Sequence, residues 1–101
     1  MSVKILPEKN GCVVAKIEGD IDHHTAKEIR ETIDEYIERY SPVFLKLDFS
    51  EVRFMDSSGI GLIMGRYKLM TSLRGKIKVV GVPKSLERMI KLSGLMTLGI
   101  F

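Results

Sequence analysis

The sequence predicts a single α/β domain over residues 1–101, with a mixed, mainly parallel β-sheet of about five strands covered by three or more helices. First, short runs rich in β-branched residues alternate with amphipathic helical patterns, giving the order β-β-α-β-α-β-α-β. Second, Asn10-Gly11 between the first two runs is a strong hairpin signal, so these strands should pair antiparallel. Third, 101 residues, 45% hydrophobic and 29% charged, suffice for one core, and no repeat or linker divides the chain.

Five segments have the composition of strands. The first alternates in polarity and ends at Pro7, as expected of a strand at a sheet edge. The third, residues 43–49, is mostly apolar on both faces, which is typical of a central strand. Residues 50–53 should form a short connector after it. The expected strands are residues 3–6, 12–17, 43–49, 77–82 and 95–101.

Three segments carry apolar residues at helical spacing. Asp22 is a candidate N-cap for the first helix, because its carboxylate can accept hydrogen bonds from the free N–H groups of the first turn; Ser41-Pro42 ends that helix. The second helix should run to about Leu73, and the third should end at Gly94. The residues expected to face inward are Ala26, Ile29, Ile33, Tyr36, Ile37 and Tyr40, then Ile60, Ile63, Met64, Tyr67 and Met70, and finally Leu86, Met89 and Ile90.

The second expected helix also contains a stripe of small residues, Ser58, Gly61 and Gly65. A glycine inside a helix costs roughly 0.5–1 kcal/mol relative to alanine. Close packing of the helix backbone, either on the sheet or on a partner, is the natural compensation.

Composition excludes several classes of protein. No apolar run approaches the roughly 18–20 residues of a membrane span, and the N-terminus lacks the apolar segment of a signal peptide. The single Cys12 cannot form an internal disulfide and is expected as a buried thiol, so we expect a cytoplasmic protein without membrane contact. Residues 1–56 carry 8 Lys/Arg against 12 Asp/Glu, whereas residues 57–101 carry 8 Lys/Arg against Glu87 alone. These cations are spread over several elements without a nucleic-acid motif, so direct DNA binding is not expected.

The sequence offers little for metal or catalytic chemistry. His23 and His24 are adjacent and point in different directions, and with Cys12 they form no zinc-binding spacing. Ser57 could meet one of these histidines at the same end of the sheet. However, residues 54–61 contain no G-x-S-x-G elbow and no phosphate-binding P-loop. We therefore expect no metal, no cofactor and no enzymatic activity.

The stretch Asp56-Ser57-Ser58-Gly59 joins a strand to a helix and presents two hydroxyls beside an acid. In the simplest interpretation the serines cap the helix, each contributing about 1 kcal/mol. Alternatively, Ser57 is phosphorylated, because the dipole and free N–H groups of a helix N-terminus favour a phosphate. A phosphate would add nearly two negative charges to a surface that already carries Asp22 and Asp56, and would repel an acidic partner.

Four segments together closely resemble the anti-sigma F factor antagonists of spore-forming bacteria, which are small proteins of the STAS domain class. The segments are residues 19–26 (G-D-I-D-H-H-T-A), 54–61 (F-M-D-S-S-G-I-G), 65–68 (G-R-Y-K) and 93–95 (S-G-L). The resemblance runs in register over about residues 3–101. The D-S-S-G corner alone indicates only the broader group of anti-sigma factor antagonists, whereas D-H-H-T-A and G-R-Y-K are similar to its sporulation branch.

The resemblance implies a partner-switching function. The unphosphorylated protein would bind a cognate anti-sigma factor that is also a serine kinase, and the sporulation sigma factor would be released. The kinase would use Mg-ATP to phosphorylate Ser57, and a serine phosphatase would restore the active form; Ser58 matches the neighbouring, unmodified position. Asp22 matches an acidic residue that pairs with a basic residue of the kinase. The partner-binding residues implied are Asp22, His23, His24, Asp56, Ser57, Ser58, Gly59 and Gly61.

The sequence differs from the family in one respect, and two alternative functions are also compatible with it. Family members usually continue past the last strand into a C-terminal helix, whereas this sequence stops at Phe101. The free helix N-terminus and the basic second half would also suit a small nucleotide-binding or hydrolysing α/β protein. The other alternative is an antagonist in a related general-stress sigma pathway, although residues 22–26 favour sporulation.

Overall fold

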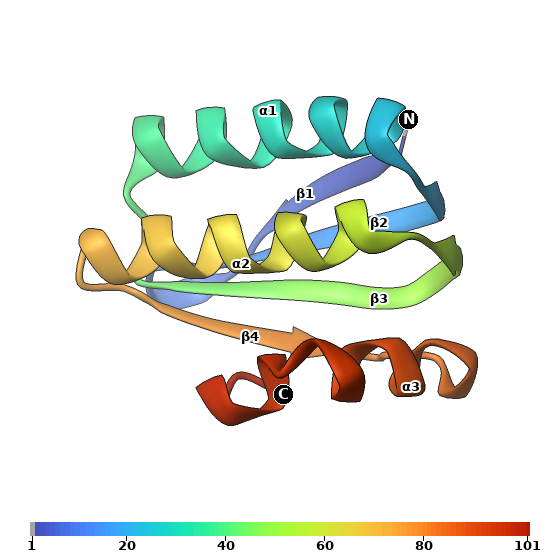
Figure 1. Cartoon of the computed structure of the whole chain (residues 1–101). Coiled ribbons are helices and arrows are strands. Elements are labelled where there is room, and N and C mark those ends of the chain that lie inside the picture. Colours follow the sequence, from blue (N-terminus) through green and yellow to red (C-terminus); the bar gives the residue numbers. More distant parts are fainter. Residues whose placement is uncertain (1) are drawn as a thin grey trace.

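The computed structural model describes residues 2–101 and is an α/β fold in which the helices lie against one four-stranded sheet (Figure 1). The strands are β1 (Val3–Pro7), β2 (Cys12–Ile21), β3 (Phe44–Met55) and β4 (Lys76–Val80). The helices are α1 (His23–Tyr40), α2 (Ser57–Ser72) and α3 (Lys84–Ser93), with short 3-10 turns η1 (Lys9–Gly11) and η2 (Leu95–Leu98). Within residues 2–101, no helix has both the length and the apolar character needed to cross a membrane.

The sheet has the order β1-β2-β3-β4 and is mixed, as predicted. β1 and β2 are antiparallel, which confirms the hairpin, and β2, β3 and β4 run parallel to one another. The connection between β1 and β2 passes through η1, where Asn10 has φ 61°, a left-handed conformation that asparagine tolerates well. The parallel strands are joined by α1 and α2, as βαβ units require.

The core lies between one face of the sheet and the helices. Over residues 12–17 of β2 and 44–49 of β3, every second residue is buried there, as Ala15 and Leu47 illustrate with 0% exposure each. The opposite face carries partly exposed residues such as Lys16 and Lys46, so the helices cover one face of the sheet rather than both. Among the residues expected to face inward, Tyr40 in the last turn of α1 is 60% exposed and Met89 on α3 is 36% exposed, so these two predictions are wrong.

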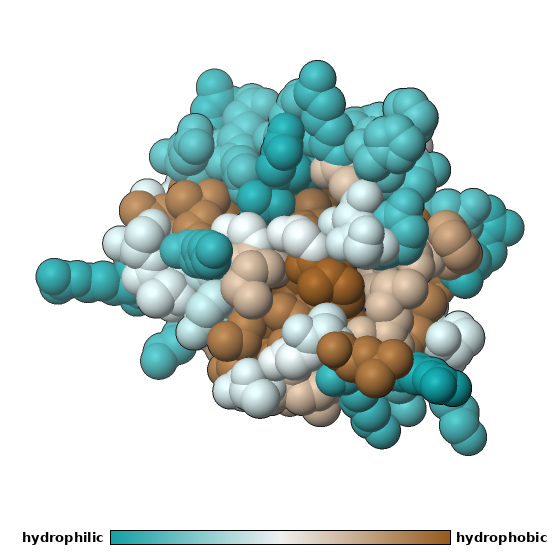
Figure 2. All heavy atoms as spheres, in the orientation of Figure 1, coloured by the Kyte–Doolittle hydropathy of each residue, from teal (hydrophilic) through white to brown (hydrophobic). Residues whose placement is uncertain are grey.

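The polarity of the surface differs from one end of the helical layer to the other. Hydrophilic side chains gather over α1, whereas hydrophobic atoms are concentrated between α2 and the C-terminal segment, which consists of α3 and η2 (Figure 2). Exposed hydrophobic residues on that segment include Leu92 at 78% and Met96 at 48%.

The predicted fifth strand over residues 95–101 is wrong. Residues 95–98 form the turn η2, and in the described chain the sheet ends at β4. Gly94 (φ 82°) and Gly99 (φ 69°) flank this turn in left-handed conformations, which interrupt the extended backbone that a strand needs. One strand-like contact remains, a hydrogen bond of 2.6 Å from the Val79 N–H to the Ile100 carbonyl.

The two central strands are longer than predicted. β3 continues through residues 50–53, which were expected to be a connector, and β2 continues to Ile21. The pairing of β2 with β3 shifts between Lys16 and Glu18 and again between Gly19 and Asp20. These irregularities accommodate extra residues without ending the ladder. As a result, both strands reach the same edge of the sheet.

Candidate functional site

The carboxyl ends of β2 and β3 bring two aspartates together. Ile21 and Met55 are paired across the two strands, and the Asp56 N–H donates a hydrogen bond of 3.1 Å to the Ile21 carbonyl. Asp22 and Asp56 therefore leave adjacent strands side by side, and each begins the following helix. The site is thus built by strand pairing between segments more than 30 residues apart.

Asp22 caps α1, as the sequence predicted. Its Oδ1 accepts hydrogen bonds from the N–H groups of His24 (2.9 Å) and Thr25 (3.0 Å). The Asp22 N–H in turn donates to the Thr25 hydroxyl at 2.9 Å, which completes a capping box. The hydrogen bond from the Thr25 N–H is the main cause that lowers the pKa of Asp22, so this carboxylate stays charged at the surface.

Asp56 caps α2, and this changes the interpretation of the two serines. The Asp56 Oδ1 accepts a hydrogen bond of 2.8 Å from the Ser58 N–H. Ser57 is the first helical residue and is exposed, and its hydroxyl makes no hydrogen bond within residues 2–101. The capping role considered for the serines is therefore filled by Asp56, and the Ser57 hydroxyl is free to meet another molecule.

His23 and His24 are both exposed at the start of α1. Their rings lie 4.0 Å apart between centroids, and the Nδ1 of His24 is 4.0 Å from the Asp22 Oδ1. In the part of the chain that the structure describes, no hydrogen bond joins either imidazole to Ser57. The arrangement lacks the serine–base contact that nucleophilic catalysis requires. Residues 2–101 also contain no group of three or more metal-binding side chains.

The three glycines of α2 have different surroundings. Gly59 is buried, and a Cβ added there would lie 2.2 Å from the Cγ and Sδ of Met55, so Gly59 is required for packing. At Gly61 and Gly65 an added Cβ would meet nothing within 4 Å. Packing of α2 on the sheet therefore does not require glycine at either position. Of the two explanations that the sequence offered, contact with a partner stays a prediction.

Gly61 and Gly65 line a groove between α1 and α2, with a volume of about 430 Å³. Lys27 and Arg30 stand on its α1 side; both are exposed, and neither is within 4.0 Å of an acidic group among residues 2–101. The groove is continuous with the corner through Ser58. Its lining consists of His23, Ala26, Lys27, Arg30, Ser58, Gly61, Leu62, Gly65 and Arg66. The sequence analysis did not identify this cationic rim.

Arg66 links the two helices beneath that groove. Its Nε is 2.8 Å from the Asp34 Oδ1, a close ionic contact without hydrogen-bond alignment, and a second nitrogen donates to the Asp34 Oδ2 at 3.3 Å. Burial lowers the pKa of Arg66 and raises the pKa of Asp34, and in each case the opposite charge of the partner works against the shift. The sequence contains a signal for this buried position, because Arg66 shares one face of the helix with the apolar residues Ile63 and Met70.

Comparison with known protein families agrees with this geometry. The STAS domain family model matches residues 4–98, so the chain belongs to the STAS domain family. Within this family, its relatives include anti-sigma factor antagonists, which confirms the resemblance. The chain is 38% identical to the anti-sigma F factor antagonist of Paenibacillus polymyxa over 85 residues, covering 84% of this chain and 73% of that protein. It is 26% identical to the anti-sigma-B factor antagonist of Listeria monocytogenes over 95 residues, covering 94% and 82%.

Solved structures give the same assignment. The anti-sigma factor antagonist SpoIIAA in its unphosphorylated form matches with a TM-score of 0.82 and 27% identity, covering 92% of this chain and 81% of that one. The Bacillus cell fate determinant SpoIIAA in its phosphorylated form matches with a TM-score of 0.76 and 26% identity, covering 94% and 86%.

Proposed function

We propose that this protein is a cytoplasmic anti-sigma factor antagonist that binds a cognate anti-sigma factor through the corner formed by Asp22, Asp56 and Ser57. In its unphosphorylated form it releases a sporulation sigma factor from that partner. The partner is also a serine kinase, and it inactivates the antagonist by phosphorylating Ser57. The antagonist holds no cofactor of its own, since Mg-ATP belongs to the kinase, and a serine phosphatase reverses the modification.

The observation that carries the proposal is the free hydroxyl of Ser57 at the first position of α2. Because Asp56 already caps the helix, Ser57 is exposed and can enter a kinase active site without the loss of a native hydrogen bond. A phosphate at this position is favoured by the helix dipole and need not unfold the domain. The resulting charge beside Asp22 and Asp56 repels carboxylates of the partner, which switches the complex off.

The docking surface has a charge pattern that constrains the partner. The corner is acidic, through Asp22 and Asp56, whereas the adjoining groove has the cations Lys27 and Arg30 on its rim. We propose a partner surface with a basic residue opposite Asp22 and an acidic segment opposite Ser57 and the groove. His23 and Ser58 line the groove next to the corner, His24 lies beside Asp22, and these three residues complete the proposed contact surface.

Phosphate mapping tests the switch. The protein is incubated with the cognate kinase and Mg-ATP and the products are analysed by mass spectrometry, with Ser57→Ala and Ser58→Ala as matched variants. Label on wild type and on Ser58→Ala, together with its loss in Ser57→Ala, supports the assignment. Label that persists in Ser57→Ala contradicts it.

A related general-stress pathway is the second candidate, because anti-sigma-B factor antagonists are also among the relatives. The higher identity to the anti-sigma F factor antagonist, 38% against 26%, favours the sporulation pathway. Competition between the two kinds of anti-sigma factor for the unphosphorylated protein decides between them, since the cognate partner should bind more tightly.

A further inference from the structure

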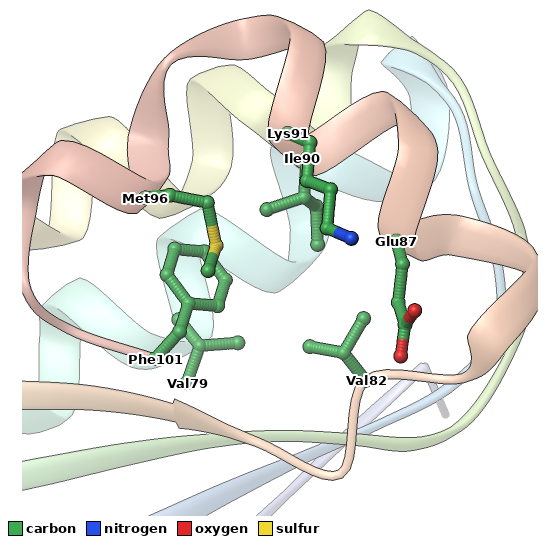
Figure 3. A pocket seen from close by; sticks show the side chains of 7 residues that line it. All are labelled: Val79, Val82, Glu87, Ile90, Lys91, Met96 and Phe101. Atoms are coloured by element: carbon green, nitrogen blue, oxygen red, sulfur yellow. The ribbon is translucent and has the colours of Figure 1, made fainter.

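A second hollow lies away from the groove of α1 and α2, between β4 and the C-terminal segment α3–η2 (Figure 3). Its volume is about 340 Å³. The floor is deeply buried, since Val79 is 3% and Ile90 is 2% exposed. Apart from two charged residues, every side chain around it is apolar. The lining consists of Val79, Val82, Glu87, Ile90, Lys91, Met96 and Phe101.

The two charged residues, Glu87 and Lys91, are four positions apart on one face of α3. This spacing permits an ion pair along a helix. Nevertheless, within residues 2–101 neither residue lies within 4.0 Å of a group of opposite charge. Figure 3 shows both side chains extending from α3 toward the same opening, above Val82. The cavity therefore presents one unpaired carboxylate and one unpaired ammonium beside an apolar floor.

The volume limits what the cavity can hold. An engineered apolar cavity of about 150 Å³ accommodates benzene, and ligand pockets begin at roughly 300 Å³. At about 340 Å³, this cavity has room for one ring or one branched aliphatic group together with a small head group. The lining does not suit a nucleotide, because its phosphates would meet a single cation, Lys91, beside the carboxylate of Glu87.

We propose that this cavity binds a free amino acid with an apolar side chain, such as phenylalanine or leucine. The α-carboxylate pairs with Lys91, the α-ammonium pairs with Glu87, and the side chain packs on Val79, Val82 and Ile90. A zwitterion satisfies both charged residues at once. A simple carboxylic acid would leave Glu87 facing a like charge, and a simple amine would do the same to Lys91. None of the residues of the Ser57 corner lines this cavity, so the proposal is independent of the switch.

Three probes of similar shape test the head-group requirement: L-phenylalanine, 3-phenylpropionate and phenethylamine. Binding is followed on the whole protein by methyl-group NMR of Val79, Val82 and Ile90 and by calorimetry. L-phenylalanine should saturate these shifts with a millimolar or lower dissociation constant, and each analogue should bind at least about tenfold more weakly, the equivalent of one lost charge-assisted contact.

Substitutions on the exposed face of α3 test the two charged residues without disturbing the core. Glu87→Gln and Lys91→Gln should each weaken L-phenylalanine binding at least about tenfold. The matched variant Lys84→Gln, on the same helix but outside the cavity, should leave it unchanged. Val82→Trp should fill the opening and abolish binding.

Several outcomes overturn the proposal. These are no saturable shift up to about 10 mM L-phenylalanine, equal affinity for 3-phenylpropionate, or binding that is insensitive to both Glu87→Gln and Lys91→Gln. A concentration-dependent dimer in sedimentation that Val82→Trp abolishes would assign the cavity to a second copy of this chain instead.

Discussion

Replacing Gly61 or Gly65 with alanine should make the protein more stable and, at the same time, a poorer binding partner. Both glycines lie inside α2, and a Cβ at either position meets nothing within 4 Å. Alanine then gains about 0.5–1 kcal/mol of helix propensity without a steric cost. In a domain of this size 1 kcal/mol corresponds to about 4–8 °C, so each variant should raise Tm by about 2–8 °C.

The effect on binding should have the opposite sign, because the new methyl groups would project from the lining of the groove between α1 and α2. We expect each variant to bind the cognate anti-sigma factor about tenfold more weakly, a loss of about 1.4 kcal/mol. Calorimetric titration measures the affinity, and thermal unfolding monitored by circular dichroism measures the stability of the same samples.

Gly59→Ala is the matched control on the same helix. Its Cβ would overlap Met55, which is 1% exposed and has little room to move. This variant should lose about 1–3 kcal/mol of stability, as overpacked cores do. A higher Tm with unchanged affinity for Gly61→Ala and Gly65→Ala would show that the groove is not part of the interface. An unchanged or lower Tm would refute the expectation that a methyl group at these two positions has no steric cost.

Three further predictions concern single side chains. Ser57→Asp should weaken binding of the anti-sigma factor by a few kcal/mol while Tm stays constant or rises slightly, since a negative charge suits a helix N-terminus; unchanged affinity in calorimetry would exclude repulsion as the switch. Arg66→Met should cost about 1–3 kcal/mol in urea unfolding at pH 7, less than a fully buried pair because Asp34 is 26% exposed. Without Arg66, the already raised pKa of Asp34 should rise further. The stability lost in Arg66→Met should therefore become smaller as pH falls toward the pKa of Asp34 in the variant. A loss of stability that does not change with pH would contradict this explanation. The pKa of Asp22 is lowered in the folded protein, so its charge should contribute fully to stability above the ordinary aspartate pKa. This contribution should be lost as pH falls through the lower folded pKa. Asp22→Asn keeps a capping oxygen but no titrating charge, so urea unfolding of this variant from about pH 6 to about pH 2 should show a smaller loss of stability in acid than wild type.

The sequence alone determined the features that depend on a few neighbouring residues. Asp22 was recognised as an N-cap, and Gly94 as the end of α3, because capping is decided by residues within one helical turn. The hairpin of β1 and β2 followed from Asn10-Gly11, and the family followed from motifs that are themselves short. The Ser57 corner was located for the same reason, since a strand-to-helix transition is a local change of periodicity.

The tertiary structure decided what depends on contacts between distant segments. Residues 95–101 have the composition of a strand, but Gly94 and Gly99 turn the chain and leave one hydrogen bond to β4. The irregular pairing of β2 with β3 is invisible in either strand alone, yet it brings Asp22 and Asp56 to one edge of the sheet.

The contact between Arg66 and Asp34, and the groove between α1 and α2, likewise arise only when the two helices pack together. Local propensity therefore placed the free hydroxyl of Ser57 at the start of a helix. Long-range packing decided which charges surround it, because a side chain's neighbours in space are set by strand register and helix packing rather than by its neighbours in sequence.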